Sequence, residues 1–390
     1  MSAFLDTKIC ENFRDSINKT DIFIYDIDYK KHYHLFCAVM DRMDSSISYL
    51  NSNADPPKSE EALLFFIMYS CMVLDAVKQL LKALDIKNVY SEEDNTLSYE
   101  FFKDICVAPP LNIPLEECPT DDKFFEYIRS LSMAHPFETN RPKFFEKGEI
   151  QYSPWVIANS TLMSVRGIED GVGIRIYSNK FDDIQDLVFS FNHIKEYVRS
   201  RFLLINKATQ KIHKIIADKE QLWKREKIPK HLPPIATLER ILEILEKRYK
   251  NPYNVELAMR YLKCPLTENK NKDIVSSYRK VITDLIPDLI EAVEELDYER
   301  MVDVLDGVLH ARPKNIHQMG HYQLEKIFGY LHVGDESLPE YKWGIQQAQN
   351  FANELSGRWV KINIDKMAAD EIKLLVRIAC FFEKKEEERL

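Results

Sequence analysis

Apolar residues recur every three to four positions along most of the chain, which is the spacing of one face of an α-helix. Glycine, which is disfavoured inside helices, accounts for only 10 of the 390 residues. The sequence therefore predicts a mainly α-helical protein. The expected helices span residues 4–18, 22–50, 59–84, 98–105, 121–135, 182–224, 236–249, 253–263, 270–296, 298–310, 317–331, 340–355 and 366–385.

The helix expected over residues 59–84 is apolar on almost every side, and this pattern places it at the centre of the N-terminal core. Ser59 is a suitable N-cap, and Glu60 and Glu61 favour the positive end of the helix. The most apolar run, residues 62–74, is about 13 residues long and too short to cross a bilayer. We therefore expect a buried core helix and no membrane partner.

The helical pattern is interrupted by a β-hairpin near residues 153–178. Trp155–Ala158 and Ile174–Tyr177 read as short strands, with several glycines between them. A very long helix is then expected from about 182 to 224, because apolar residues return there at heptad spacing. At 1.5 Å per residue it would span roughly 60 Å, so it must lie against several other helices or a second subunit.

A domain boundary is expected after this long helix, at Pro229, Pro233 and Pro234. Residues 1–232 would form a helical domain that includes the hairpin and the long helix. Residues 233–390 would form a second helical domain, which we expect to offer a surface to a protein partner.

Charge is unevenly distributed along the chain. The formal net charge is −9, which argues against a protein coated in nucleic acid. Residues 195–231 nevertheless hold eleven Lys or Arg against four Asp or Glu, whereas residues 284–306 hold nine acidic residues and one Arg. The basic stretch could follow an RNA backbone or dock onto the acidic stretch, and the sequence favours neither.

The seven cysteines are scattered, odd in number and include no C-x-x-C pair, which is typical of reduced thiols in a cytosol. The first residues lack the basic start and apolar run of a signal peptide. We therefore expect a cytoplasmic protein.

Three residues have the spacing of zinc ligands on a helix, namely His317, His321 and Glu325. Gly320 weakens that helix and no motif partner accompanies them, so an ordinary helix surface is the simpler interpretation. We expect neither a metal ion nor a cofactor.

The segment that indicates chemistry is the amphipathic helix opened by Thr120, which carries Arg129 and His135 and stops at Pro136. Histidine can transfer a proton near neutral pH, and arginine can hold the charge that develops on a phosphate. A histidine on an apolar helix face is also commonly a core residue with one hydrogen bond. On a straight helix, residues six apart differ by about 600° in rotation and ~9 Å in rise, so the two side chains would not face each other. Their convergence requires a helix end before Pro136 or a second copy of the helix.

Spacing alone is a weak signal, because the chain contains two further arginines followed at similar distance by histidine. Arg225 and His231 lie on either side of Pro229, and Arg312 begins a helix with Arg-Pro before His317. The pair Arg129 and His135 is distinguished by its context in an aromatic-faced helix that ends in Ala-His-Pro.

Residues 121–141 resemble the signature helix of the HEPN superfamily of helical ribonucleases and nucleotide-binding domains. That family carries Arg, four to six residues and then His, often as Ala-His followed by Pro or Asn. Two long helices before the motif and one after it are also similar to the family. The resemblance implies a metal-independent endoribonuclease that acts on RNA as a homodimer, of the kind found among toxins and antiviral abortive-infection proteins.

By this resemblance Arg129 and His135 would be the catalytic pair, and Ser130 would contact the substrate beside them. Arg141 would either add a second phosphate contact or pair with Glu138 on the surface. Active family members usually carry Asn, Asp or His where this chain has Ser130. This departure motivates the alternative of a non-catalytic helical binding or scaffold protein.

Overall fold

The computed structural model describes residues 3–139, 148–161, 168–180, 183–316, 318–331 and 336–389. The chain divides into two compact units, Met1–Ile216 and Ala217–Leu390. Both are mainly helical and the first contains a small antiparallel sheet, which confirms the expected fold class. The division lies inside helix α9 (Ile205–Arg225), whereas the sequence placed it after residue 232.

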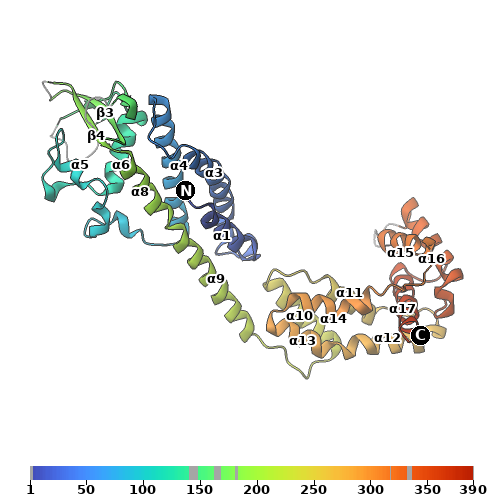
Figure 1. Cartoon of the computed structure of the whole chain (residues 1–390). Helices are drawn as coiled ribbons and strands as arrows, with labels where there is room; N and C mark the ends of the chain where they lie inside the picture. Colours follow the sequence, from blue (N-terminus) through green and yellow to red (C-terminus); the bar gives the residue numbers. More distant parts are fainter. Residues whose placement is uncertain are drawn as a thin grey trace. The chain divides into compact units, whose positions relative to one another are not determined.

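Unit 1 is built on two long helices that lie side by side, α3 (Tyr33–Ser52) and α4 (Glu60–Ala83) (Figure 1). The helix expected over 22–50 is interrupted, because Asp26 leaves helical geometry and its carboxylate accepts the backbone N–H of Asp28 at 3.0 Å. The short elements of this unit are α1 (Thr7–Asn18), α2 (Ile22–Tyr25), η1 (Lys30–His32), η2 (Val89–Ser91), η3 (Thr96–Tyr99), α5 (Lys103–Val107) and η4 (Leu115–Glu117).

Helix α4 is the central helix of unit 1. Ser59 Oγ accepts the backbone N–H of Ala62 at 3.2 Å, which confirms the predicted cap. Among the described helices, α4 alone is long and apolar enough to cross a membrane by length and composition. Half of that apolar window is buried inside the structure.

The sheet has four strands, β1 (Gln151–Tyr152), β2 (Val156–Ile157), β3 (Gly171–Ser178) and β4 (Gln185–Ser190). Strands β2 and β3 pair antiparallel, with Val156 opposite Ile174, as the predicted hairpin required. Strand β3 also pairs with β1 and along six positions with β4. A Cβ at Gly173 would lie 2.6 Å from the carbonyl oxygen of Leu187, so only glycine permits β4 to approach this closely.

The prediction of a single helix over residues 182–224 is wrong. Its first part is strand β4, and the rest is two helices, α8 (Phe191–Phe202) and α9. Leu187 and Phe189 are buried alternately, which is the period of a strand. Ser190 then caps α8, since its Oγ accepts the backbone N–H of Asn192 at 3.1 Å.

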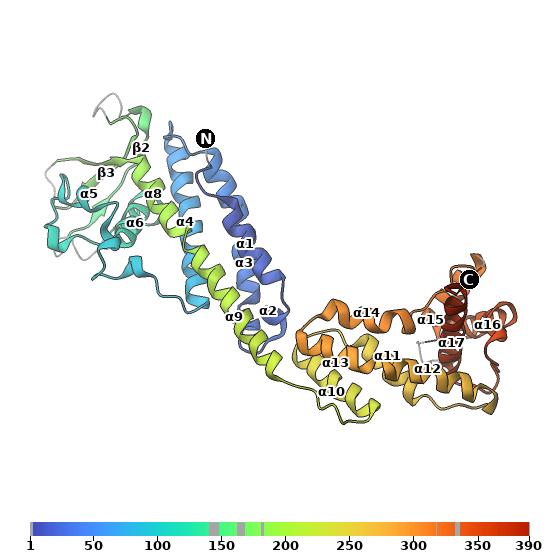
Figure 2. The ribbon, with the colours of Figure 1, turned by 60° about the horizontal axis from the view of Figure 1, so that its bottom comes forward.

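Unit 2 is entirely helical among its described residues. Helices α10 (Pro234–Lys247), α11 (Tyr253–Lys263), α13 (Ile286–Glu295) and α14 (Tyr298–Leu309) pack together (Figure 2). The other helices are η6 (Asn269–Asn271), α12 (Lys272–Asp284), α15 (Gln318–Tyr330), α16 (Pro339–Glu354), η7 (Ser356–Arg358) and α17 (Ala369–Glu387).

Two features of unit 2 differ from the sequence expectation or extend it. The helix expected over 270–296 ends at Asp284 and restarts at Ile286, because Pro287 supplies no N–H to a continuous helix. Lys227 at the end of the basic stretch pairs with Glu294 of the acidic stretch at 2.9 Å.

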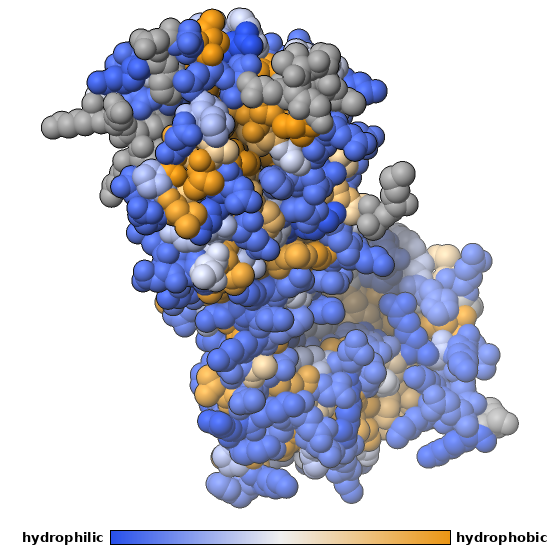
Figure 3. All heavy atoms as spheres, turned by 60° about the vertical axis from the view of Figure 1, so that its left-hand side comes forward, coloured by the Kyte–Doolittle hydropathy of each residue, from blue (hydrophilic) through white to orange (hydrophobic). Residues whose placement is uncertain are grey.

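The surface does not present one broad apolar area on the face drawn in Figure 3. Hydrophobic residues there form separate patches between hydrophilic ones. Scattered apolar residues of this kind are ordinary on a soluble protein.

Candidate active site

The helix that carries the candidate residues is α6 (Asp121–Arg129), followed directly by a π-helical turn, η5 (Ser130–Ala134). Thr120 caps α6, since its side chain accepts the backbone N–H of Lys123. Phe124 and Ile128 are fully buried on the inner face of the helix.

The π-turn decides where His135 lies. The backbone N–H of His135 donates to the carbonyl of Ser130 at 2.8 Å, five residues earlier rather than four. Phe124, Ile128 and Leu131 are buried, and an uninterrupted α-helix would place His135 next on that face. The extra residue in the turn carries His135 past the apolar face, and its side chain is exposed. The interpretation of His135 as a core residue is therefore wrong.

The chain after His135 is held by the sheet. Buried Thr139 exchanges two backbone hydrogen bonds with Gln151 of β1, at 3.0 and 3.1 Å. Its hydroxyl donates to the carbonyl of His135 at 2.6 Å and lies 3.3 Å from Ser130 Oγ. The Ser130 hydroxyl therefore helps to fix the π-turn, in addition to lining the cavity described below.

A buried chain of polar groups connects α6 to the same sheet. Tyr127 donates its hydroxyl to Gln151 Oε1 at 2.6 Å, and Gln151 Nε2 donates to Glu149 at 2.8 Å. Ser178 of β3 donates to the same Glu149 oxygen at 3.3 Å. Burial, together with the nearby Glu149 charge, raises the pKa of Tyr127 well above its ordinary value, so this phenol stays protonated.

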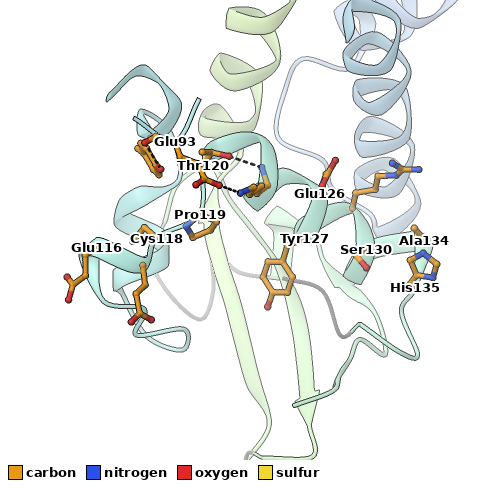
Figure 4. A pocket seen from close by; sticks show the side chains of 14 residues that line it. Glu93, Glu116, Cys118, Pro119, Thr120, Glu126, Tyr127, Ser130, Ala134 and His135 are labelled. Atoms are coloured by element: carbon orange, nitrogen blue, oxygen red, sulfur yellow. Dashed lines mark hydrogen bonds and ion pairs between the residues drawn. The ribbon is translucent and has the colours of Figure 1, made fainter. Parts of the chain in front are cut away.

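Arg129 and His135 line one cavity of about 960 Å³, which we call the first cavity. Both side chains are exposed, and neither forms a hydrogen bond or ion pair with a described residue. Figure 4 shows His135 and Ala134 at one end of this cavity, Glu116 and Cys118 at the other, and Tyr127 between them.

The first cavity has an acidic wall. Four glutamates line it, Glu93, Glu116, Glu117 and Glu126, together with the cations Lys123 and Arg129. Lys123 is ion-paired with Glu93, so its charge is neutralised. Among the described residues that line this cavity, Arg129 therefore remains as the lysine or arginine available to a phosphate.

Arg129 also lies close to helix α4. Burial raises the pKa of the Cys71 thiol to about 12, and the Arg129 charge acts in the opposite direction. The guanidinium thus lies near Cys71 as well as at the cavity that contains His135.

Two predictions made from sequence fall outside the described residues. Arg141, the expected second phosphate contact, is one, and His317 of the zinc-like spacing is the other. Among the described residues, no group of three or more His, Cys, Asp or Glu is placed to hold a metal ion.

Residues that sequence reasoning missed lie on α4 and α8. Lys78 and Lys82 line a second cavity with Arg129, and Arg201 is buried there beside Asp122. The signal available in the sequence was the four-residue spacing of the two lysines on a helix that is otherwise apolar.

Comparison with family models, curated proteins and solved structures finds no match to this chain.

Proposed function

We propose that this chain is a metal-independent endoribonuclease of the HEPN type, which acts on RNA as a homodimer and serves as a toxin or antiphage abortive-infection effector. The observation that supports the proposal is the shared exposure of Arg129 and His135 at one cavity. Among the described residues His135 has no hydrogen-bonding partner and Arg129 has no carboxylate partner, so both side chains are available to a substrate.

The reaction can be balanced with these two residue types. The ribose 2′-oxygen attacks phosphorus and loses its proton to a histidine, while the bond from phosphorus to the 5′-oxygen breaks. The leaving 5′-oxygen takes a proton from a second histidine, and Arg129 holds the charge on the phosphoryl oxygens. The products are a 2′,3′-cyclic phosphate and a 5′-hydroxyl.

The proposal includes a dimer because the reaction uses two histidines, one as the base and one as the acid. His135 of one copy cannot act as base and as acid in the same step, and a twofold axis at the cavity would supply a second His135. The acidic first cavity would also gain a second Arg129.

The proposal is tested by an RNA-cleavage assay in EDTA with Arg129→Ala and His135→Ala. His135→Ala should lose about 10²- to 10⁴-fold in rate, as is usual when a general acid or base is removed. Arg129→Ala should lose about 10²- to 10³-fold, as is usual when one group that stabilises the developing charge is removed. The exposed residues Arg42 and His34 lie outside the cavity, so Arg42→Ala and His34→Ala are matched controls that should keep wild-type rates. An unchanged rate in either cavity variant would contradict the proposal.

The second candidate is a non-catalytic binding or scaffold protein. It is favoured by the acidic wall of the first cavity, which repels a polyanion, and by Ser130, whose hydroxyl lies against Thr139. In that case purified wild-type protein would leave varied RNAs intact, and expression of wild type and His135→Ala would have the same effect on cells.

A further inference from the structure

A second cavity of about 460 Å³ lies between α4, α6 and α8, on the other side of a ridge formed by α6. The ridge consists of Thr120, Lys123, Glu126 and Arg129, which are spaced by three residues and line both cavities. His135 lines the first cavity and not the second. Lys123 on the same ridge is ion-paired with Glu93, so among the described residues Arg129 is the cation without an ion pair that lines both cavities.

The cations of the second cavity are largely unneutralised. Lys78 and Lys82 lie one helical turn apart on α4, and both are exposed. Within the described part of the chain, neither lysine forms an ion pair, and Arg129 likewise forms none. Three positive charges thus face this space without a partner.

The carboxylates of the second cavity leave a positive balance. Asp122 is fully engaged, because it accepts from Ser91 at 2.7 Å, Tyr197 at 3.0 Å and Arg201 at 2.9 Å. Asp75 and Glu126 remain as the uncompensated acids lining this space. Three cations against two carboxylates give the second cavity a positive sign, opposite to that of the first.

Arg201 adds a buried donor to the second cavity. Its side chain is only 4% exposed and stacks on Tyr90 and Tyr197, with ring centroids 4.4 and 4.7 Å from the guanidinium carbon. Its Nη2 is buried, donates no hydrogen bond to a described residue and lies 4.0 Å from Asp121. Arg201 therefore contributes positive charge at the second cavity that is shared with Asp121 and Asp122.

We propose that the second cavity binds phosphate groups of the RNA strand that flank the phosphate held by Arg129, with Lys78 and Lys82 as the contacting residues. This inference rests on the proposed function, because Arg129 would hold the scissile phosphate on the ridge between the cavities. The strand leaves the acidic first cavity at Arg129 and continues along the cationic side of α6.

The test measures the salt dependence of binding of a labelled single-stranded RNA to His135→Ala protein, which binds without cleavage. In this background Lys78→Gln with Lys82→Gln is compared with Lys30→Gln and Lys31→Gln, two exposed lysines outside both cavities. Each phosphate contact of a single strand contributes about 0.7 to the slope of log affinity against log salt. The first pair should reduce this slope by about 1.4, and the control pair should leave it unchanged.

The outcomes separate this inference from the proposed function. An equal slope in both double variants, with wild-type protein cleaving RNA, overturns the phosphate-binding role and leaves the ribonuclease proposal intact. A slope that depends on Lys78 and Lys82, with wild-type protein unable to cleave, supports the cavity as an RNA site and contradicts the enzymatic step. Absence of RNA binding at 50 mM salt overturns the inference.

Discussion

At the scale of single residues, the position of His135 is set by one hydrogen bond rather than by its neighbours in sequence. The bond from its N–H to the carbonyl of Ser130 closes a five-residue loop and moves the side chain from the apolar face to solvent. π-turns recur at functional sites because they re-aim one side chain without breaking a helix. The His135 side chain therefore lies outside the apolar core and is accessible to a ligand.

A different histidine gives the molecule a pH-dependent stability. Burial lowers the pKa of His310, and the charges of Arg377 and Arg312 lower it further. Its Nε2 donates to Asn254 Oδ1 at 3.0 Å, a bond that the neutral and the protonated ring can both make, so burial and the two arginines set the direction of the shift. As the pH falls through the unfolded value of about 6.5, the unfolded chain takes up a proton before the folded chain does, so the free energy of unfolding decreases.

We therefore expect the melting temperature to fall between pH 7.5 and pH 5.5, and to fall less in His310→Gln. Thermal unfolding followed by circular dichroism at both pH values measures the difference. His34→Gln, at an exposed position in unit 1, should retain the wild-type dependence. Equal pH dependence in wild type and His310→Gln would show that His310 makes no contribution.

At the scale of elements, the π-turn is testable as a unit because its extra residue can be removed. Deletion of Met133 should convert η5 to an α-helical turn and bring His135 onto the face of Ile128 and Leu131. RNA cleavage should then fall as far as it does in His135→Ala. Met133→Ala keeps the length of the turn and should retain activity within a few-fold. Full activity after the deletion would mean that the π-turn does not determine the site.

The elements also show how far the sequence could predict this fold. Helix α4 and its Ser59 cap were predictable, because a long apolar run and a local cap are signals within one element. Strand β4 was missed because Leu187 is apolar in both a heptad pattern and an alternating pattern, and only pairing with β3 distinguishes them. The decisive signal lay in Gly173, whose missing side chain admits the neighbouring strand.

The candidate site was predictable in position but not in arrangement. The sequence identified Arg129 and His135, yet a π-turn has no pattern of its own in a single sequence. The second cavity was not expected, because Lys78, Arg129 and Arg201 come from three separate helices that only the tertiary structure brings together.

At the scale of the whole molecule, the proposed chemistry needs two histidines in one cleft and therefore two chains. Mixing wild-type protein with an equal amount of His135→Ala protein should lower cleavage to about one quarter of the wild-type rate at the same total concentration, because a mixed dimer retains only one histidine in the shared cleft. With random exchange about half of the dimers would be mixed. Analytical ultracentrifugation should report the dimer in the same samples. A mixture that keeps about half of the wild-type rate while mixed dimers are present would contradict a shared cleft.

Strand β3 positions two parts of the candidate site, because it pairs with the strands that lead to each of them. On one edge it pairs with β1, whose Gln151 holds Thr139 and so the turn after His135. On the other edge it pairs with β4, which passes at Ser190 directly into α8 without a loop, and α8 carries Arg201 about 16 Å further on. The sheet therefore fixes both the turn that carries His135 and the helix that carries Arg201 at the second cavity, and a shift of one strand would alter the distance between them.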